Sequence, residues 1–303
     1  MAADLHPVTA HTPAARVLGA LGQVLRIAIY AGLCFVFLVP FVWMVFGGVR
    51  AENEIFANLI PFSLRTFIPI EWTLESYLTV LGMNETGRML GYSFGRNLGN
   101  SFFVSTAVVL LSLVFNTMGA YFFARLRFPG KKYLILFVLA TFLVPFEATI
   151  VPLYVVVRSL GLHNSYGALI VPWFASPFVI FSLIQFMRDQ IPYELDEAAL
   201  IDGAGYWTTL WRVIVPNTVP GLVTNGLLEF QFIWNLFYWP LISVTSKEIQ
   251  VLQVVIAGTL GQNQQYWGRT FAGSSLATIP VVVIFLLLQR YYVQGVASTG
   301  VKG

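Results

Sequence analysis

Tyr193-Glu-Leu-Asp-Glu-Ala-Ala-Leu-Ile-Asp-Gly-Ala204 is a polar stretch that lies between two apolar spans of the chain. Pro192, directly before it, suits a first helical position, and Gly203 is placed to end a helix. Acidic side chains are favoured near the positive end of a helix, and the first turns carry Glu194, Asp196 and Glu197. The pattern therefore predicts a short helix of about ten residues.

The predicted helix has a narrow apolar face. At about 100° per residue, Leu195, Ala198 and Ala199 fall on one arc, and the acidic residues surround it. A small-residue face with a charged collar suits docking into a groove on another protein. An ordinary solvated helix is the alternative, since Glu-Ala-Ala by itself is common in helices.

The rest of the chain has the composition of a membrane protein. Of its 303 residues, 57% are hydrophobic and 10% are charged, with a mean hydropathy of +0.75, whereas about 25% of residues in soluble domains are charged. The formal net charge of +3 comes with no basic run, so no nucleic-acid partner is expected. The single cysteine, Cys34, excludes an intrachain disulfide, and the three histidines lack the spacing of metal ligands. We expect an all-α, polytopic protein of the lipid bilayer, without a metal or cofactor of its own.

Six stretches are apolar enough to form transmembrane helices. They are residues 27–49, 98–124, 133–157, 166–187, 219–244 and 270–289. The first is free of charge over its whole length, about 34 Å of helix, which covers a hydrocarbon core of about 30 Å. A cleaved signal peptide is the alternative for this stretch, but its apolar region is longer than the usual ~7–15 residues. Pro145 and Pro152 predict kinks in the third span.

The basic residues orient these spans. Arg125, Arg127, Lys131 and Lys132 crowd into one loop, which the positive-inside rule assigns to the cytoplasm. With six spans, both termini are then cytoplasmic, and the long connection after the first span lies outside. The expected parts are a cytoplasmic tail at 1–26, a transmembrane domain at 27–293 with a cytoplasmic loop at 189–218, and a cytoplasmic tail at 294–303.

The polar stretch belongs to a longer pattern. Glu197-Ala-Ala is followed after three residues by Gly203 and, nine residues later, by Val213-Ile-Val-Pro216. This pattern resembles the EAA motif of the membrane subunits of binding-protein-dependent ABC importers, with Val in place of the usual Ile and Leu at positions 213 and 215. Pro145-Phe-Glu-Ala-Thr-Ile-Val-Pro152 and Leu160-Gly-Leu-His-Asn-Ser-Tyr166 resemble the carbohydrate branch of these permeases, and within it the G-type subunits of maltose transporters.

The resemblance implies a type I ABC importer permease fold with six transmembrane helices, in a bacterial or archaeal plasma membrane. It implies three kinds of protein partner: a second, homologous permease that forms a heterodimer, two copies of a cytoplasmic ATPase, and an extracytoplasmic solute-binding protein. ATP and Mg would be held by the ATPase, since no G-x-x-x-x-G-K-[ST] occurs here and Gly130-Lys-Lys132 lacks the upstream glycine. The chain would therefore be a transport subunit without catalytic residues.

The resemblance also assigns residues to the ATPase contact. The helix around Glu197 would be the coupling helix, which sits in a cleft of the ATPase and passes ATP-driven motion into the membrane. Its residues are Glu194, Glu197, Ala198, Ala199, Asp202, Gly203 and Pro216. A C-terminal tail would reach between the two ATPases, and a tail without fixed structure is the alternative. The residues of this tail are Thr299, Gly300, Val301, Lys302 and Gly303.

Two acidic residues inside predicted spans, Glu147 and Glu229, are candidates for contact with substrate, because ionisable groups in membranes are costly and usually face a cavity or a partner. Groups near Glu229 could bond sugar hydroxyls or stack on sugar faces. They are Asn225, Gln231, Trp234 and Asn235. Helical spacing divides these groups between two faces, so they cannot all line one path. Hydrogen bonding between helices is an equal alternative for both acids.

The expected function is the import of a sugar, with di- or oligosaccharides favoured, by alternating access driven by a separate ATPase. An ABC importer for a non-sugar solute, such as glycerol phosphate, is the nearest alternative. A secondary transporter would need no ATPase and would more often show two matching halves, and the sequence shows no such repeat.

Overall fold

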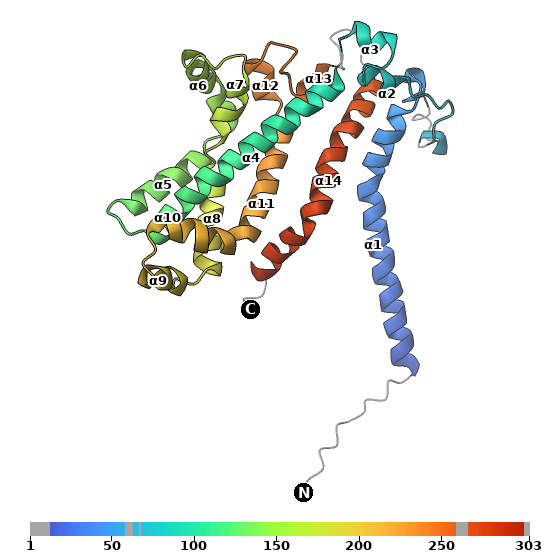
Figure 1. Cartoon of the computed structure of the whole chain (residues 1–303). Helices are drawn as coiled ribbons and strands as arrows, with labels where there is room; N and C mark the ends of the chain where they lie inside the picture. The colour runs from blue at the N-terminus through green and yellow to red at the C-terminus, as the bar shows by residue number, and fades with distance from the viewer. Residues whose placement is uncertain (1–12, 58–62, 67, 92, 259–265, 300–303) are drawn as a thin grey trace.

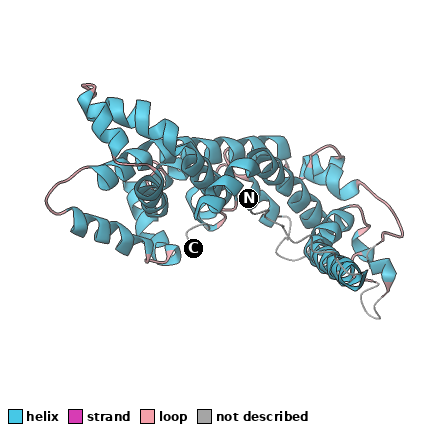
Figure 2. Cartoon of the chain, turned by 90° about the horizontal axis from the view of Figure 1, so that it is seen from below, coloured by secondary structure: helices cyan, strands magenta, loops and turns pink. Residues whose placement is uncertain are grey.

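Long helices carry the architecture of the chain, which the computed structural model describes at residues 13–57, 63–66, 68–91, 93–258 and 266–299. Five of these helices are α1 (Pro13–Gly48), α4 (Phe94–Arg125), α8 (Pro177–Gln190), α11 (Val215–Trp234) and α14 (Trp267–Thr299). α11 packs against α4, α8 and α14, and α4 packs against α8, whereas α1 stands apart and meets mainly α14 (Figure 1). Seen from below, the body is elongated and almost wholly helical (Figure 2).

Shorter elements lie at the two ends of the long helices (Figure 1). At the end where α4 begins are η1 (Glu52–Glu54), η2 (Leu64–Thr66), α2 (Glu75–Val80), α3 (Glu85–Met89), α12 (Tyr238–Ser243) and α13 (Leu252–Gly258). α6 (Phe146–Ser159) and α7 (Tyr166–Ile170) lie at this end too, and η3 (Val171–Trp173) joins α7 to α8. At the opposite end are α9 (Glu194–Ile201), α10 (Tyr206–Thr209) and a π-helical turn, η4 (Leu210–Ile214).

Four described stretches are long and apolar enough to cross a membrane: Leu21–Gly48, Phe94–Arg125, Tyr166–Gln190 and Trp267–Gln289. A fifth is counted if the bent pair α5 (Lys131–Phe142) and α6 is one span. Among the described residues, the expected count of six is therefore not confirmed. α11, where the fifth span was expected, is rich in Asn, Thr and Gln. This polarity makes α11 less hydrophobic than the four stretches that could cross a membrane.

The third predicted span is bent at Pro145, as predicted, but it consists of two helices rather than one kinked helix. α5 and α6 meet at 101° across a short break that ends at Pro145. A proline has no N–H to continue the helix, and its ring disfavours helical backbone in the residue before it. Pro145 therefore stops one helix and precedes the next, while Pro152 lies inside α6.

The fifth predicted span, residues 219–244, also breaks. α11 ends at Trp234, and the next residue, Asn235, closes it: both its backbone N–H and its side-chain amide donate to the carbonyl of Gln231, at 3.2 and 2.8 Å. α12 begins only at Tyr238. The helices of the first and sixth predicted spans are longer than predicted. α1 begins well before residue 27, and α14 continues past residue 289.

A buried apolar cluster joins the helices at the end that carries α9. It combines side chains of α4, α8 and η4 with neighbours from the connecting segments. Its members are Ala120, Tyr121, Ala124, Val179, Leu183, Ile184, Met187, Ile191, Leu210 and Ile214. This cluster is the base on which the candidate functional site is built.

Candidate functional site

α9 is the short helix predicted from the polar stretch, and it has eight residues rather than about ten. Gly203 follows it with a φ of +80°, in the left-handed region that favours glycine. There the N–H of Ala204 donates to the carbonyl of Ala199 at 2.9 Å, and the N–H of Gly203 donates to the carbonyl of Leu200 at 3.0 Å. These two bonds form a Schellman motif, so Gly203 ends the helix as its position predicted.

α9 turns one side towards the body and leaves another free. Ala199 is buried, and the side chain of Asp196 is only 14% exposed, whereas Ile201 is 86% exposed. The predicted faces of the helix are therefore wrong in two places. Ala199 is buried, whereas Leu195 and Ala198, predicted on the same face, are exposed; and Asp196, predicted among the exposed acidic residues, is partly buried. The free surface consists of Glu194, Leu195, Glu197, Ala198, Leu200 and Ile201.

Arg125, at the end of α4, holds the buried side of α9. Its Nε lies 3.3 Å from Oδ2 of Asp196, and its side chain is only 3% exposed. The guanidinium lies over the ring of Tyr193, 4.2 Å from the centroid. Nη2 donates to the carbonyls of Met187 at 3.0 Å and Ile191 at 2.6 Å. Burial raises the pKa of Asp196, and the positive charge of Arg125 opposes that rise.

Two cavities border this contact. One of about 80 Å³ is lined by Arg125 and Asp196, and an apolar one of about 300 Å³ lies beside it. Tyr121 and Tyr206 line both. Trp207, which is 62% exposed, lines the larger cavity. Exposed Trp and Tyr side chains are typical of the level of lipid headgroups, so α10 suits the surface of a membrane.

Pro216, the last residue of the motif, lies in the first turn of α11. It has no N–H for the carbonyl of Arg212, four residues earlier, and η4 directly precedes α11. A π-helical turn is wider than an α-helical one and accommodates such a missing bond. α10, η4 and α11 therefore follow one another without an intervening loop. Asp202, another residue of the motif, is the C-cap of α9.

The substrate candidates do not gather on one surface. Asn225 and Glu229 are buried on α11, with 2% and 7% exposure, and Trp234 is buried near its end. This placement suits the alternative role, hydrogen bonding between helices. The exposed candidates are Gln231, Asn235 and Glu147.

The sequence reasoning missed a buried polar group near Glu229. Asn116 of α4 is 1% exposed, and its amide nitrogen donates to Oγ of Ser112 at 2.7 Å. Its amide oxygen accepts from the N–H of Ser176 at 3.0 Å, and the Ser176 side chain lies close to the Glu229 carboxyl. The signal was present, since Ser112 and Asn116 are four residues apart in the mostly apolar middle of α4, a pattern typical of polar contacts between membrane helices.

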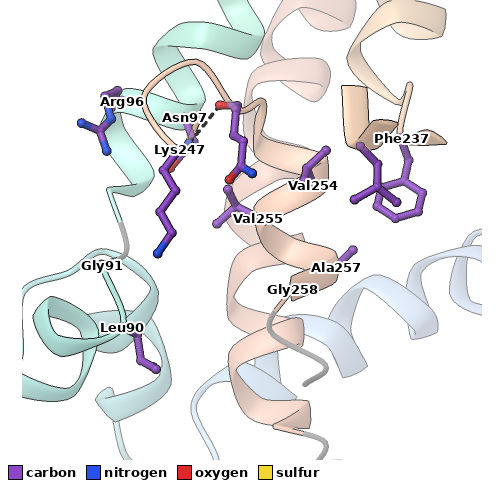
Figure 3. A pocket seen from close by; sticks show the side chains of 12 residues that line it. Leu90, Gly91, Arg96, Asn97, Phe237, Lys247, Val254, Val255, Ala257 and Gly258 are labelled. Carbon is purple, nitrogen blue, oxygen red and sulfur yellow. Dashed lines mark hydrogen bonds between the residues drawn. The ribbon is translucent and has the colours of Figure 1, made fainter. Parts of the chain in front are cut away.

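At the opposite end of the body from α9, a cavity of about 520 Å³ opens between the start of α4, α12 and α13 (Figure 3). Arg96 and Lys247 lie on its lining together with Phe237. The side-chain amide of Asn97 donates to the carbonyl of Gln250 at 2.9 Å, and so ties this end of α4 to the segment before α13 (Figure 3). The predicted topology puts this end outside the cell.

Part of the predicted C-terminal contact lies outside the described residues. Thr299 is the last residue of α14. Gly300, Val301, Lys302 and Gly303 are beyond it.

Residues 116–298 match the protein family described as "Binding-protein-dependent transport system inner membrane component". The chain is 30% identical over 274 residues to the arabinooligosaccharides transport system permease protein AraQ of Halalkalibacterium halodurans, an alignment that covers 90% of this chain and 94% of the relative. It is 37% identical over 229 residues to the trehalose transport system permease protein SugB of Mycobacterium tuberculosis, which covers 74% of this chain and 83% of the relative.

The fold is similar to that of a chain in the crystal structure of a bacterial ABC transporter involved in the import of the acidic polysaccharide alginate. The TM-score is 0.70 at 23% sequence identity, and the superposition covers 95% of this chain and all of the other. This likeness shows that the helices described above are arranged in the type I ABC permease fold.

Proposed function

Because the chain belongs to the family of binding-protein-dependent transport system inner membrane components, we propose that it is the permease subunit of an ATP-driven importer for sugars or related solutes. Di- and oligosaccharides are favoured, because relatives named for such sugars align with most of the chain. The single observation that carries the proposal is the family match over residues 116–298, which includes α9 and the motif that ends at Pro216.

Three protein partners belong to this proposal: a second, homologous permease, two copies of a cytoplasmic ATPase that hold ATP and Mg, and an external solute-binding protein. The family's own description supports the last of these. The surface of α1 supports a large partner in the membrane, since no residue in the most apolar part of its span is buried within this chain. Lipid can cover part of that surface, and a second permease the rest.

In the proposed mechanism, α9 is the coupling helix. Its free surface presents small and apolar side chains, Ala198 and Ile201, beside the carboxylates of Glu194 and Glu197, a combination suited to a groove with basic edges. ATP binding closes the ATPase pair, and the two coupling helices move together. The spans then open outward, where the binding protein releases its cargo, and hydrolysis resets the path. Both termini and α9 lie in the cytoplasm in this scheme.

A charge reversal on α9 tests the proposal. Glu197→Lys should abolish co-purification of the ATPase and ligand-stimulated ATP turnover without affecting membrane insertion, because it places a cation in a groove that takes an anion. Glu85→Lys is the matched control, since Glu85 is likewise exposed in the first turn of a helix, α3, at the other end of the body. Normal co-purification and turnover in Glu197→Lys would sink the assignment of α9.

The identity of the solute needs a separate experiment. A ligand screen on the cognate binding protein should find a di- or oligosaccharide. Binding of glycerol phosphate, and of no sugar, would favour the nearest alternative, an importer of the same family for a non-sugar solute.

A further inference from the structure

α4 is the helix that connects the two ends of the body. It has 32 residues, or about 48 Å at 1.5 Å per residue, enough to cross a bilayer. No proline lies inside it, whereas α1, α11 and α14 each contain one, and the pair α5 and α6 is broken. Prolines and breaks are the usual places where helices bend. α4 is therefore the stiffest path between the ends among the described helices.

One end of α4 is fixed to α9 by Arg125. A guanidinium has a planar fork of donors, and here it spans two backbone carbonyls, a carboxylate and an aromatic ring at once. Tyr193 adds a bond of its own, because its hydroxyl donates to the carbonyl of Ala124 at 3.1 Å. Removing Arg125 would leave the carboxylate of Asp196 partly buried without its counter-charge, a costly state. The attachment is thus specific to this side chain.

The other end of α4 is fixed to the segment before α13. The side-chain amide of Asn100 donates to the carbonyls of Glu248 at 2.8 Å and Gln250 at 3.0 Å. Oγ of Ser101 accepts from the N–H of Leu252 at 2.8 Å. These bonds, with the one from Asn97, hold residues 248–252 against the first turns of α4. A displacement of α4 along its axis would therefore carry this segment with it.

We propose that Arg125 is a positioning residue that makes α9 and α4 one rigid body, so that a displacement of α9 is delivered through α4 to residues 248–252. This inference rests on the proposed function in one respect: the displacement of α9 is supplied by a bound ATPase. The segment that receives it lines the cavity of Figure 3, through Gln250. Nucleotide state inside the cell and the shape of the outer cavity are thereby linked within this one subunit.

A distance measurement tests the rigid body. In a Cys34→Ser background, which removes the single cysteine, spin labels are placed at Gly99→Cys on α4 and Gly205→Cys just after α9. A Cβ at either position meets no atom within 4 Å. In the complete transporter, the label distance should be the same in the nucleotide-free and ATP-bound states. A label distance that differs between these states in protein with an intact Arg125 would overturn the proposal.

Transport per ATP hydrolysed tests the role of Arg125. Arg125→Gln should lower this ratio and should broaden the distribution of label distances, because the fork of donors that fixes α9 to α4 is lost. Arg125→Lys keeps a charge for Asp196 but has no fork of donors, and should fall between. Arg127→Gln is the matched control, because Arg127 is exposed and forms no hydrogen bond or ion pair with the described residues.

The outcomes separate this inference from the proposed function. If the ATPase does not co-purify with the unmutated chain, the proposed function fails and the inference fails with it. If the ATPase co-purifies but Arg125→Gln transports as much solute per ATP as the unmutated protein, only the inference is overturned. Should Arg125→Gln fail to assemble, Arg125→Lys and the label distance in the unmutated protein still decide.

Discussion

Gly203 offers the sharpest prediction about α9. Its φ of +80° is in the left-handed region, where a residue with a Cβ costs roughly 1–2 kcal/mol. A Cβ at this position meets no atom within 4 Å, so the cost of Gly203→Ala is conformational and includes no clash. If the ATPase binds α9 with this turn intact, its affinity should fall by a factor of about 5–30.

The assay is a titration of the purified ATPase against the permease pair in detergent. Gly203→Asn should lie between glycine and alanine, because asparagine tolerates the left-handed region better than other residues with a Cβ. Gly205→Ala is the matched control: its φ of −76° is ordinary, and a Cβ there also meets nothing within 4 Å. The reasoning is refuted if Gly203→Ala binds the ATPase as tightly as the unmutated protein, or if Gly205→Ala weakens binding as much as Gly203→Ala.

Three further substitutions test the body around the site. Trp239→Phe should lower the free energy of unfolding by about 1–3 kcal/mol, because its buried Nε1 donates to the carbonyl of Ala168 at 2.8 Å; an unchanged melting temperature would contradict this. Gly47→Val should detach α1 from α14, since a Cβ there would lie 2.4 Å from the ring of Phe271. Limited proteolysis should then cleave α1 from the rest of the chain faster than in the unmutated protein, and an unchanged cleavage rate would contradict this. Asn97→Ala should speed hydrogen exchange in residues 248–252, where it removes one backbone contact; unchanged exchange would count against the attachment.

The helix α9 could be predicted because its signals are local. Gly203 fixes its end through backbone conformation, and the acidic residues fix its start through the helix dipole. Its orientation could not be predicted in the same way. Asp196 faces the body because Arg125, far earlier in the chain, lies beneath it, and helical periodicity contains no information about such a partner.

The spans show the same division between local and long-range information. Pro145 indicated a disturbance in the third span, and the sequence could not tell a kink from the 101° break between α5 and α6, because that angle depends on which neighbours cover the freed backbone groups. The polar side chains of α11 were visible in the sequence. That Asn225 and Glu229 turn into the body, while Gln231 and Asn235 stay exposed, depends on how α11 packs against α4 and α8.

Uptake of a labelled oligosaccharide into proteoliposomes tests the central claim most directly. The vesicles contain this chain, the second permease and the ATPase, with the binding protein on the outside. The account predicts that uptake requires both ATP in the lumen and the binding protein, and that Glu197→Lys abolishes it. Uptake driven by an ion gradient without ATP would contradict the account and point to a secondary transporter.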